Sequence, residues 1–279
     1  MKTILVVSDL HCGSVYGLLP PPNLLTLSDD RTINLNPGQK HLWDCWSSLC
    51  EYANEINPSV IVINGDAIDG GAPKDRGSEL CLPMLADQAE AARVCLDTLI
   101  KSCDTEPAIF MTAGTAYHVG VAAREEEEVA RCIGARRYKG LGTGRFLKEV
   151  LDLEIDGVVL NFAHHGGTAG GFYRATMADR EGIWSALAGK DGKSPKADFV
   201  GRAHAHCFVH LEHASKHITY GPCWQLQTRF MRHGSVYRMI PDLGAYSISV
   251  DGDAKKKGRD PIDVHKLLFP LPPYTTTKL

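Results

Sequence analysis

The sequence of 279 residues lacks the features that mark membrane, disulfide-rich and zinc-ribbon proteins. No apolar run approaches the roughly 20 residues that span a bilayer. The first residues, one lysine followed by a strand pattern, do not have the form of a signal peptide. The nine cysteines are scattered, odd in number and without a Cys-x-x-Cys pair. We therefore expect reduced thiols, a cytoplasmic location and no membrane partner.

Excess charge of one sign is also lacking. A formal net charge of -3 and a pI near 6.4 give no overall attraction to nucleic acid or to anionic lipid. The 44% of hydrophobic and 23% of charged residues are ordinary for a soluble globular protein that buries a substantial core. We expect one domain over residues 1–279, with a loop excursion at about 13–38 and an irregular C-terminal tail from about 251. That loop is interpreted either as functional or as a surface excursion.

Short runs rich in β-branched residues alternate with segments of helical spacing, which favours an α/β fold built from βαβ units. Strands are predicted at 2–7, 60–64, 108–113, 146–155, 158–163, 197–201, 208–211, 216–220 and 245–250. Helices are predicted at 41–56, 82–102, 125–133 and 174–187. The four glutamates that open the third helix are interpreted as a solvated first turn, where acids suit the helix dipole.

Five of the predicted strands end on acids, histidines or a threonine. These residues are Asp9 and His11, Asp66, Thr115 and His118, His164 and His165, and His204 and His206. Because the carboxyl ends of strands form the binding crevice of an open α/β sheet, we expect these side chains to converge. Any one histidine pair is compatible with a structural role. Together, carboxylates and imidazoles favour a site for Mn, Fe, Zn or Ni over Mg or Ca alone.

The order of these motifs resembles the calcineurin-like metallophosphoesterase superfamily. Asp-x-His, Gly-Asp-x-x-Asp, a glycine-led motif with histidine, His-Gly and His-x-His follow one another between Asp9 and His206. The resemblance implies a four-layer αββα sandwich of two mixed β-sheets flanked by helices. The family's Gly-Asn-His-Asp/Glu is replaced by Gly114-Thr115-Ala116-Tyr117-His118 here, a Gly-Thr-x-x-His variant that resembles a phage and prophage subgroup.

The resemblance also implies a dinuclear metal centre, with manganese favoured. Asp9, His11, Asp66 and His206 would hold one metal, and Asp66 would bridge to a second metal held by His204 and by His164 or His165. We favour His165, because His165-Gly166-Gly167 is similar to the family's His-Gly-Gly form. The Thr115 hydroxyl or a water would replace the missing asparagine, and Asp69 would support a ligand or close a turn.

The expected activity is hydrolysis of a phosphoester by a metal-bound hydroxide. The resemblance gives His118 the role of assisting the leaving group, with ligation of the second metal as the alternative. Arg145, Arg174 and Arg202 are candidate phosphate-binding residues, because guanidinium groups bind phosphate oxygens in pairs. The alternatives are a nuclease acting on DNA or RNA, which would need a local basic groove, and a non-catalytic binding module on the same scaffold.

Overall fold

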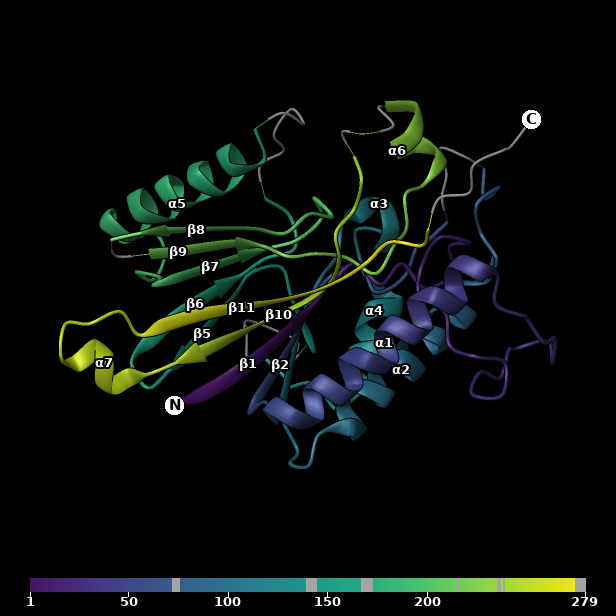
Figure 1. The fold of residues 1–279 in the computed structure, drawn as a ribbon, viewed down its shortest axis with the longest axis horizontal. Coiled ribbons are helices and arrows are strands. Elements are labelled where there is room, and N and C mark those ends of the chain that lie inside the picture. Colours follow the sequence, from purple (N-terminus) through teal and green to yellow (C-terminus); the bar gives the residue numbers. More distant parts are fainter. Residues whose placement is uncertain are drawn as a thin grey trace.

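The chain folds into four layers, with two sheets packed face to face and helices on both outer faces (Figure 1). The computed structural model describes residues 1–71, 76–138, 145–166, 173–214, 216–234, 237 and 239–273. Gly167 of the expected His-Gly-Gly motif lies outside these residues. The predicted sandwich of two mixed sheets is confirmed.

The first sheet has six strands in the order β11-β10-β1-β2-β3-β4. Its strands are β1 (Lys2–Val7), β2 (Val60–Asn64), β3 (Ala108–Thr112), β4 (Leu147–Lys148), β10 (Leu243–Val250) and β11 (Ile262–Phe269). The four strands from β1 to β4 run parallel to one another. Strand β10 pairs antiparallel with β1, and β11 pairs antiparallel with β10. The carboxyl ends of β1, β2 and β3 therefore meet at one edge.

The second sheet has five strands in the order β5-β6-β7-β9-β8. Its strands are β5 (Leu151–Ile155), β6 (Val158–Phe162), β7 (Phe199–Arg202), β8 (Val209–His213) and β9 (Lys216–Tyr220). The Asp156-Gly157 turn joins β5 to β6, and both of its residues have the positive φ that such hairpin turns need. Because β6, β7 and β9 are parallel, the ends of β6 and β7 also meet at one edge.

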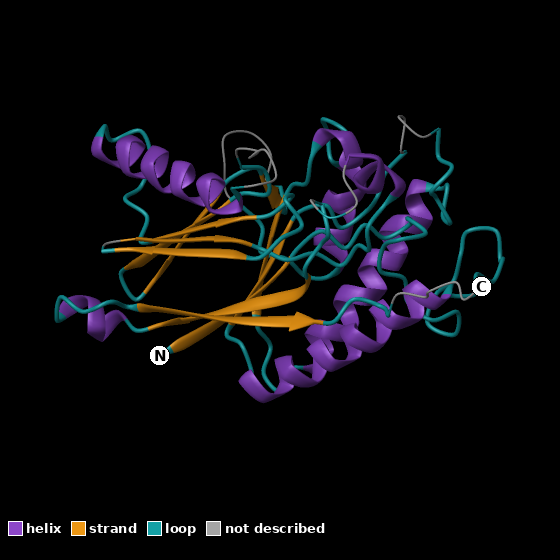
Figure 2. Cartoon of the chain, turned by 45° about the horizontal axis from the view of Figure 1, so that its top comes forward, coloured by secondary structure: helices purple, strands orange, loops and turns teal. Residues whose placement is uncertain are grey.

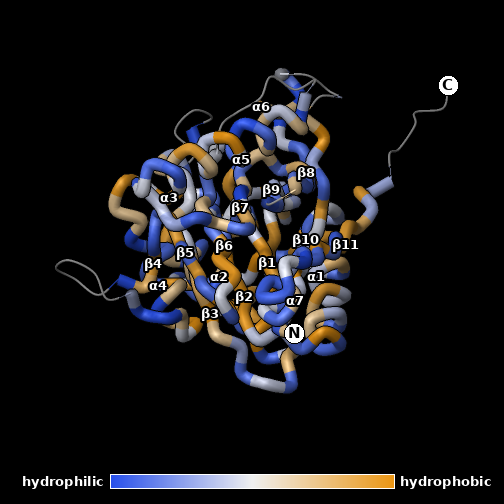
Figure 3. The backbone as a smooth tube through the Cα atoms, turned by 90° about the vertical axis from the view of Figure 1, so that its left-hand side faces the viewer, coloured by the Kyte–Doolittle hydropathy of each residue, from blue (hydrophilic) through white to orange (hydrophobic). Residues whose placement is uncertain are grey.

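Helices lie on the two outer faces of the sheets and beside the ends of the strands (Figure 2). They are α1 (Pro37–Ile56), α2 (Leu85–Ser102), α3 (Ala116–Val119), α4 (Arg124–Cys132), α5 (Arg174–Lys190), α6 (Arg229–Gly234) and α7 (Gly252–Lys256). One apolar cluster joins α1, α2 and α4 to the first sheet, a second lies between the sheets, and a third joins α5 to the second sheet. Figure 3 shows the apolar strands running through the middle.

Several predicted boundaries are wrong. The strand predicted at 146–155 is two strands, β4 and β5, which belong to different sheets. The tail is not irregular from residue 251, because α7 and β11 follow, and β11 pairs with the whole of β10. The first helix starts at Pro37 and not at residue 41. The Asn36 side chain accepts a hydrogen bond from the backbone N–H of Gln39, whose side chain accepts one from Asn36 in return. This reciprocal cap fixes the start of α1.

The loop between β1 and α1 begins beside the strand ends. The carbonyl of Cys12 accepts the backbone N–H of Asp69, and Val15 donates its N–H to Glu79. Further along, Leu18 and Leu27 are buried in the cluster under α1 and α2. The loop is therefore packed into the domain beside the strand ends.

Candidate metal centre

Most of the predicted metal ligands, together with His118, meet where the ends of β1, β2, β3, β6 and β7 come together. Five of them adopt left-handed backbone, with φ of 54° at Asp9, 47° at His11, 49° at Asp66, 66° at His204 and 52° at His206. Asparagine, aspartate and histidine tolerate this region better than most residues, yet such clustering is unusual. Unfavourable backbone of this kind persists where the surroundings impose it, and it gathers at functional sites.

The first ligand group consists of Asp9, His11 and His206. His206 Nε2 lies 3.2 Å from Asp9 Oδ1 and 3.2 Å from His11 Nε2. On its other side, His11 Nδ1 lies 3.0 Å from Asp69 Oδ1, which also accepts a hydrogen bond from Gln225. A carboxylate that accepts the far N–H of an imidazole orients it as a metal ligand.

The second group consists of Asp66, His164 and His204. His164 Nε2 lies 3.0 Å from Asp66 Oδ2 and 3.7 Å from Asp9 Oδ1, so the two groups adjoin. His164 Nδ1 lies 2.6 Å from the Asn64 carbonyl and must donate its hydrogen there. Nε2 therefore faces the carboxylates and is the nitrogen that a metal would bind in place of a proton.

The structure places His164, and not the favoured His165, among the carboxylates. His164 is buried, whereas His165 is exposed and its ring lies against that of His204. Thr115 donates its backbone N–H to Asp66 Oδ1 at 2.7 Å, and its hydroxyl lies within 3.3 Å of both carboxylate oxygens. Thr115 therefore holds the Asp66 carboxylate, which is a different contact from the expected metal ligand.

His118 lies on α3 and contacts the site from that helix. Its Nδ1 lies 2.7 Å from the Asp69 carbonyl, and its ring packs edge-on against His11. His11, Asp66 and His118 form a third group with ligand distances. Both roles expected for His118, ligand and proton donor, therefore remain compatible with its position.

Two glycines let the strand ends approach so closely. Gly65 has a φ of 77°, and a side chain there would overlap the His164 ring. A side chain at Gly114 would overlap the carboxylate and backbone of Asp66. The strand–glycine–aspartate pattern is thus required by the packing of one ligand loop on another.

Sequence reasoning missed Glu126, one of the four glutamates of α4. It is fully buried, and its two carboxylate oxygens accept the backbone N–H groups of Ala67 and Gly114, each at 2.8 Å. These groups belong to the loops that carry Asp66 and Thr115. The interpretation of this run as a solvated helix start is wrong at Glu126, because α4 packs directly beneath both loops. A run of identical residues carries no signal of which one points inward.

The three arginines have other partners. Arg202 is 9% exposed and donates to Glu181 of α5 and to Asn161, both at 2.9 Å. Arg174 contacts Asp242, and Arg145 contacts Glu127. Arg202 therefore joins β7 to α5, because strand alternation points its side chain away from the face shared by the two sheets.

The charges of the centre shift several pKa values in the metal-free protein. Burial alone would lower the pKa of His11, but its hydrogen bonds to Asp69 and Asp9 raise it to about 10. Burial likewise opposes the charged form of His164, yet the negative charges of Asp66 and Asp9 raise its pKa to about 10. Burial and the positive charge of His164 lower the pKa of His204 to about 4. In the metal-free protein, the protons on His11 and His164 therefore supply the positive charge between the carboxylates.

A divalent metal fits this donor set. Asp9 Oδ1 and His164 Nε2 are fully buried and lack a hydrogen-bond partner among the described residues, although each faces opposite charge. Buried polar atoms without hydrogen bonds are rare and point to an ion. Mixed carboxylate and imidazole ligands suit Mn, Fe, Zn or Ni.

Metal affinity should therefore rise with pH. The metal must displace protons from His11 and His164, so each proton weakens apparent binding below the raised pKa of about 10. Affinity should increase by up to about tenfold per pH unit for each displaced proton. Competition with a fluorescent chelator between pH 6.5 and 9, with proton release measured in two buffers, checks this. A flat profile without proton release would contradict the protonation assigned to these histidines.

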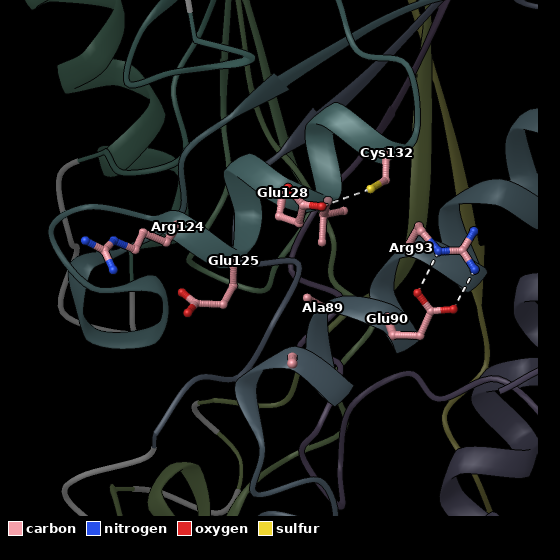
Figure 4. A pocket seen from close by; sticks show the side chains of 9 residues that line it. Ala89, Glu90, Arg93, Arg124, Glu125, Glu128 and Cys132 are labelled. Carbon is pink, nitrogen blue, oxygen red and sulfur yellow. Dashed lines mark hydrogen bonds and ion pairs between the residues drawn. The ribbon is translucent and has the colours of Figure 1, made fainter. Parts of the chain in front are cut away.

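Two pockets border the start of α4. One, of about 440 Å³, is lined by Tyr117, His118 and Val121 and so opens beside the third ligand group. The other lies between α2 and α4 (Figure 4), where Arg93 is paired with Glu90. Of these two pockets, only the first includes a residue of the ligand groups, His118.

None of the helices in the described part of the chain combines the length and the apolar character needed to cross a membrane.

No protein-family model matches the sequence, and no curated protein matches it. Solved structures match at low identity. An archaeal phosphodiesterase is 12% identical with a TM-score of 0.45, over 96% of this chain and 100% of that one. Vps29 with bound zinc from Entamoeba histolytica is 9% identical with a TM-score of 0.40, over 96% and 99%. A predicted phosphoesterase from Streptococcus pneumoniae is 10% identical with a TM-score of 0.36, over 95% and 98%.

Proposed function

We propose that this chain hydrolyses a phosphoester at a dinuclear metal centre. The observation that carries the proposal is the pair of adjoining ligand groups, which bring Asp9 and Asp66 together with His11, His164, His204 and His206. Bound divalent ions would supply a hydroxide nucleophile and neutralise the charge of the phosphate. Manganese is the favoured metal, by the motif resemblance alone.

The protein's own residues would position the metal ligands and protonate the leaving group. Asp69 orients His11 through Nδ1, and Thr115 fixes both oxygens of Asp66. His118 donates its Nδ1 hydrogen to the Asp69 carbonyl, so Nε2 is the nitrogen that would take up a second proton and pass it to a leaving group. Because His118 also lines the 440 Å³ pocket, a leaving group in that pocket would lie beside it.

The test is metal reconstitution followed by a substrate screen. The stripped protein is loaded with Mn, Zn, Fe or Ni and assayed on generic phosphomonoesters, phosphodiesters, DNA and RNA. Activity that needs metal supports the proposal, and the preferred substrate separates a phosphatase from a nuclease. Stoichiometric metal without turnover of any phosphoester would instead favour a binding module.

Replacing His118 by asparagine should lower turnover while metal content stays nearly intact. Loss of the proton donor should cost on the order of 10²–10⁴-fold for alkoxide leaving groups. Activated aryl leaving groups need no proton and should lose little. Turnover on both substrate types and metal content are measured together. An equal loss on both types, with loss of one metal, would make His118 a ligand.

A further inference from the structure

A second histidine cluster lies on the β8–β9 pair, apart from the centre described above. It contains His210, Glu212 and His217, whose ligand atoms all lie within 4.8 Å of one another. The antiparallel register sets His210 opposite Thr219 and Glu212 opposite His217, which puts all four on one face of the pair. The other face, including Ile218, packs against α5.

The cluster is separate from the dinuclear centre. His217 pairs with Phe199 at the start of β7, whereas His204 follows the far end of that strand. Five residues along the chain correspond to roughly 16 Å in extended conformation. None of the three residues belongs to the ligand groups at the strand ends.

The hydrogen bonds around the cluster fix the hydrogen of His217 and allow two tautomers of His210. His217 Nε2 is 2.8 Å from Asp260 Oδ2, and a carboxylate accepts, so Nε2 carries the hydrogen. His210 Nδ1 is 2.8 Å from the Thr219 hydroxyl, which accepts when Nδ1 is protonated. The two remaining nitrogens, His217 Nδ1 and His210 Nε2, then face each other with lone pairs at 3.4 Å. In this tautomer the two facing lone pairs need a cation between them, whereas in the other tautomer His210 Nε2 donates its hydrogen to His217 Nδ1.

This separation matches joint ligation of one ion. Two imidazole nitrogens on a tetrahedral zinc at about 2.0–2.1 Å lie roughly 3.3 Å apart. His11 and His206 show a comparable spacing of 3.2 Å in the first ligand group. His217 is 4% exposed and oriented by Asp260, as a ligand with an outer carboxylate partner should be. Glu212 is exposed on the same face and supplies a third, anionic donor.

We propose that His210, Glu212 and His217 form a separate structural site for a divalent cation of the zinc class. Asp260 precedes β11 and is anchored there by the backbone N–H of Ile262. Through His217 and Asp260, a bound ion would connect the outer pair of the second sheet to the edge strand of the first sheet. Occupancy should therefore raise stability and leave catalysis at the strand ends unchanged.

The experiment counts zinc bound by the chelator-stripped full chain and follows its thermal unfolding. Wild type should bind one equivalent more than His210→Ala, and part of the rise in Tm with zinc should be absent from that variant. His213→Ala is the matched control, because His213 lies on the same strand, exposed and beside Asp179. It should keep the extra equivalent. Asp66→Asn should also keep it, which makes the result independent of the proposed hydrolysis.

Glu212→Gln gives a second variant that does not endanger folding, because Glu212 is exposed. It should weaken zinc binding at this site by about tenfold or more, as loss of an anionic ligand does. With cobalt in place of zinc, the visible absorption of a tetrahedral site should appear in wild type and be absent from His210→Ala. Equal zinc counts in wild type and both variants would overturn the proposal. That outcome would mean that a proton, and not a metal, joins His210 to His217.

Discussion

Asp66→Asn should abolish metal-dependent hydrolysis and release metal in the same step. The Asp66 carboxylate faces His164 Nε2 at 3.0 Å and belongs to two of the ligand groups. Asparagine keeps the shape and the contact with Thr115 but removes the negative charge that the metal requires. Asparagine also tolerates the left-handed backbone at this position, where φ is 49°. The loss should therefore report the missing charge rather than backbone strain.

The loss of metal affinity and activity in Asp66→Asn should exceed the loss caused by replacing a residue that only supports a ligand. Outer partners of metal ligands typically cost about 10–100-fold in affinity or activity, and a ligand shared between two ion sites should cost more. Asp69→Asn is the matched control, because Asp69 contacts His11 Nδ1 and not the ligand nitrogen. Metal content and turnover are measured on both variants, with circular dichroism to check folding. Wild-type metal content and turnover in Asp66→Asn would show that the centre is wrongly assigned.

Glu126→Gln should destabilise the protein and weaken metal binding without touching a ligand. The carboxylate accepts two buried backbone N–H groups, from Ala67 and Gly114. An amide has one oxygen, so its NH₂ group would face one of these donors. An unsatisfied buried donor costs about 1–3 kcal/mol. Because these two backbone groups anchor the loops of Asp66 and Thr115, metal affinity should fall by roughly 10–100-fold.

Glu128→Gln is the control for Glu126→Gln. Glu128 lies on the same helix, with its side chain 55% exposed and paired with Arg131. An exposed pair of this kind contributes at most about 1 kcal/mol. Urea unfolding and metal titration of the two variants give the comparison. Equal, small effects in both would show that the buried carboxylate does not support the loops.

The sequence shows where most strands lie along the chain and which strand ends carry the candidate metal ligands. Apolar runs that stop at Asp9, Asp66, His164 and His204 predict strands with polar ends, and those ends coincide in space. The physical reason is local. A buried strand needs an unbroken apolar run, and the first polar residue after it stands at the edge of the sheet. The motif resemblance thus predicted the two-sheet sandwich, and the strand ends predicted most of the side chains that converge at its edge.

The sequence pattern does not show which of two adjacent histidines faces the carboxylates, or which distant segments pair as strands. His164 and His165 are identical in type, and it is the hydrogen bond from His164 Nδ1 to the Asn64 carbonyl that turns His164 toward the carboxylates. The pairing of β11 with β10 likewise depends on a partner strand and not on local pattern.

The sequence pattern also does not show the partners of side chains that bond to a different helix, strand or loop. Glu126 differs from its three neighbours only through the loops that α4 packs against, and Arg202 faces α5 because β7 alternates in that sense. His217 meets Asp260 across 43 residues of chain. Burial, tautomer and hydrogen-bond partner are properties of the packed chain, because each is set by residues that lie far apart in sequence and come together only when the layers assemble.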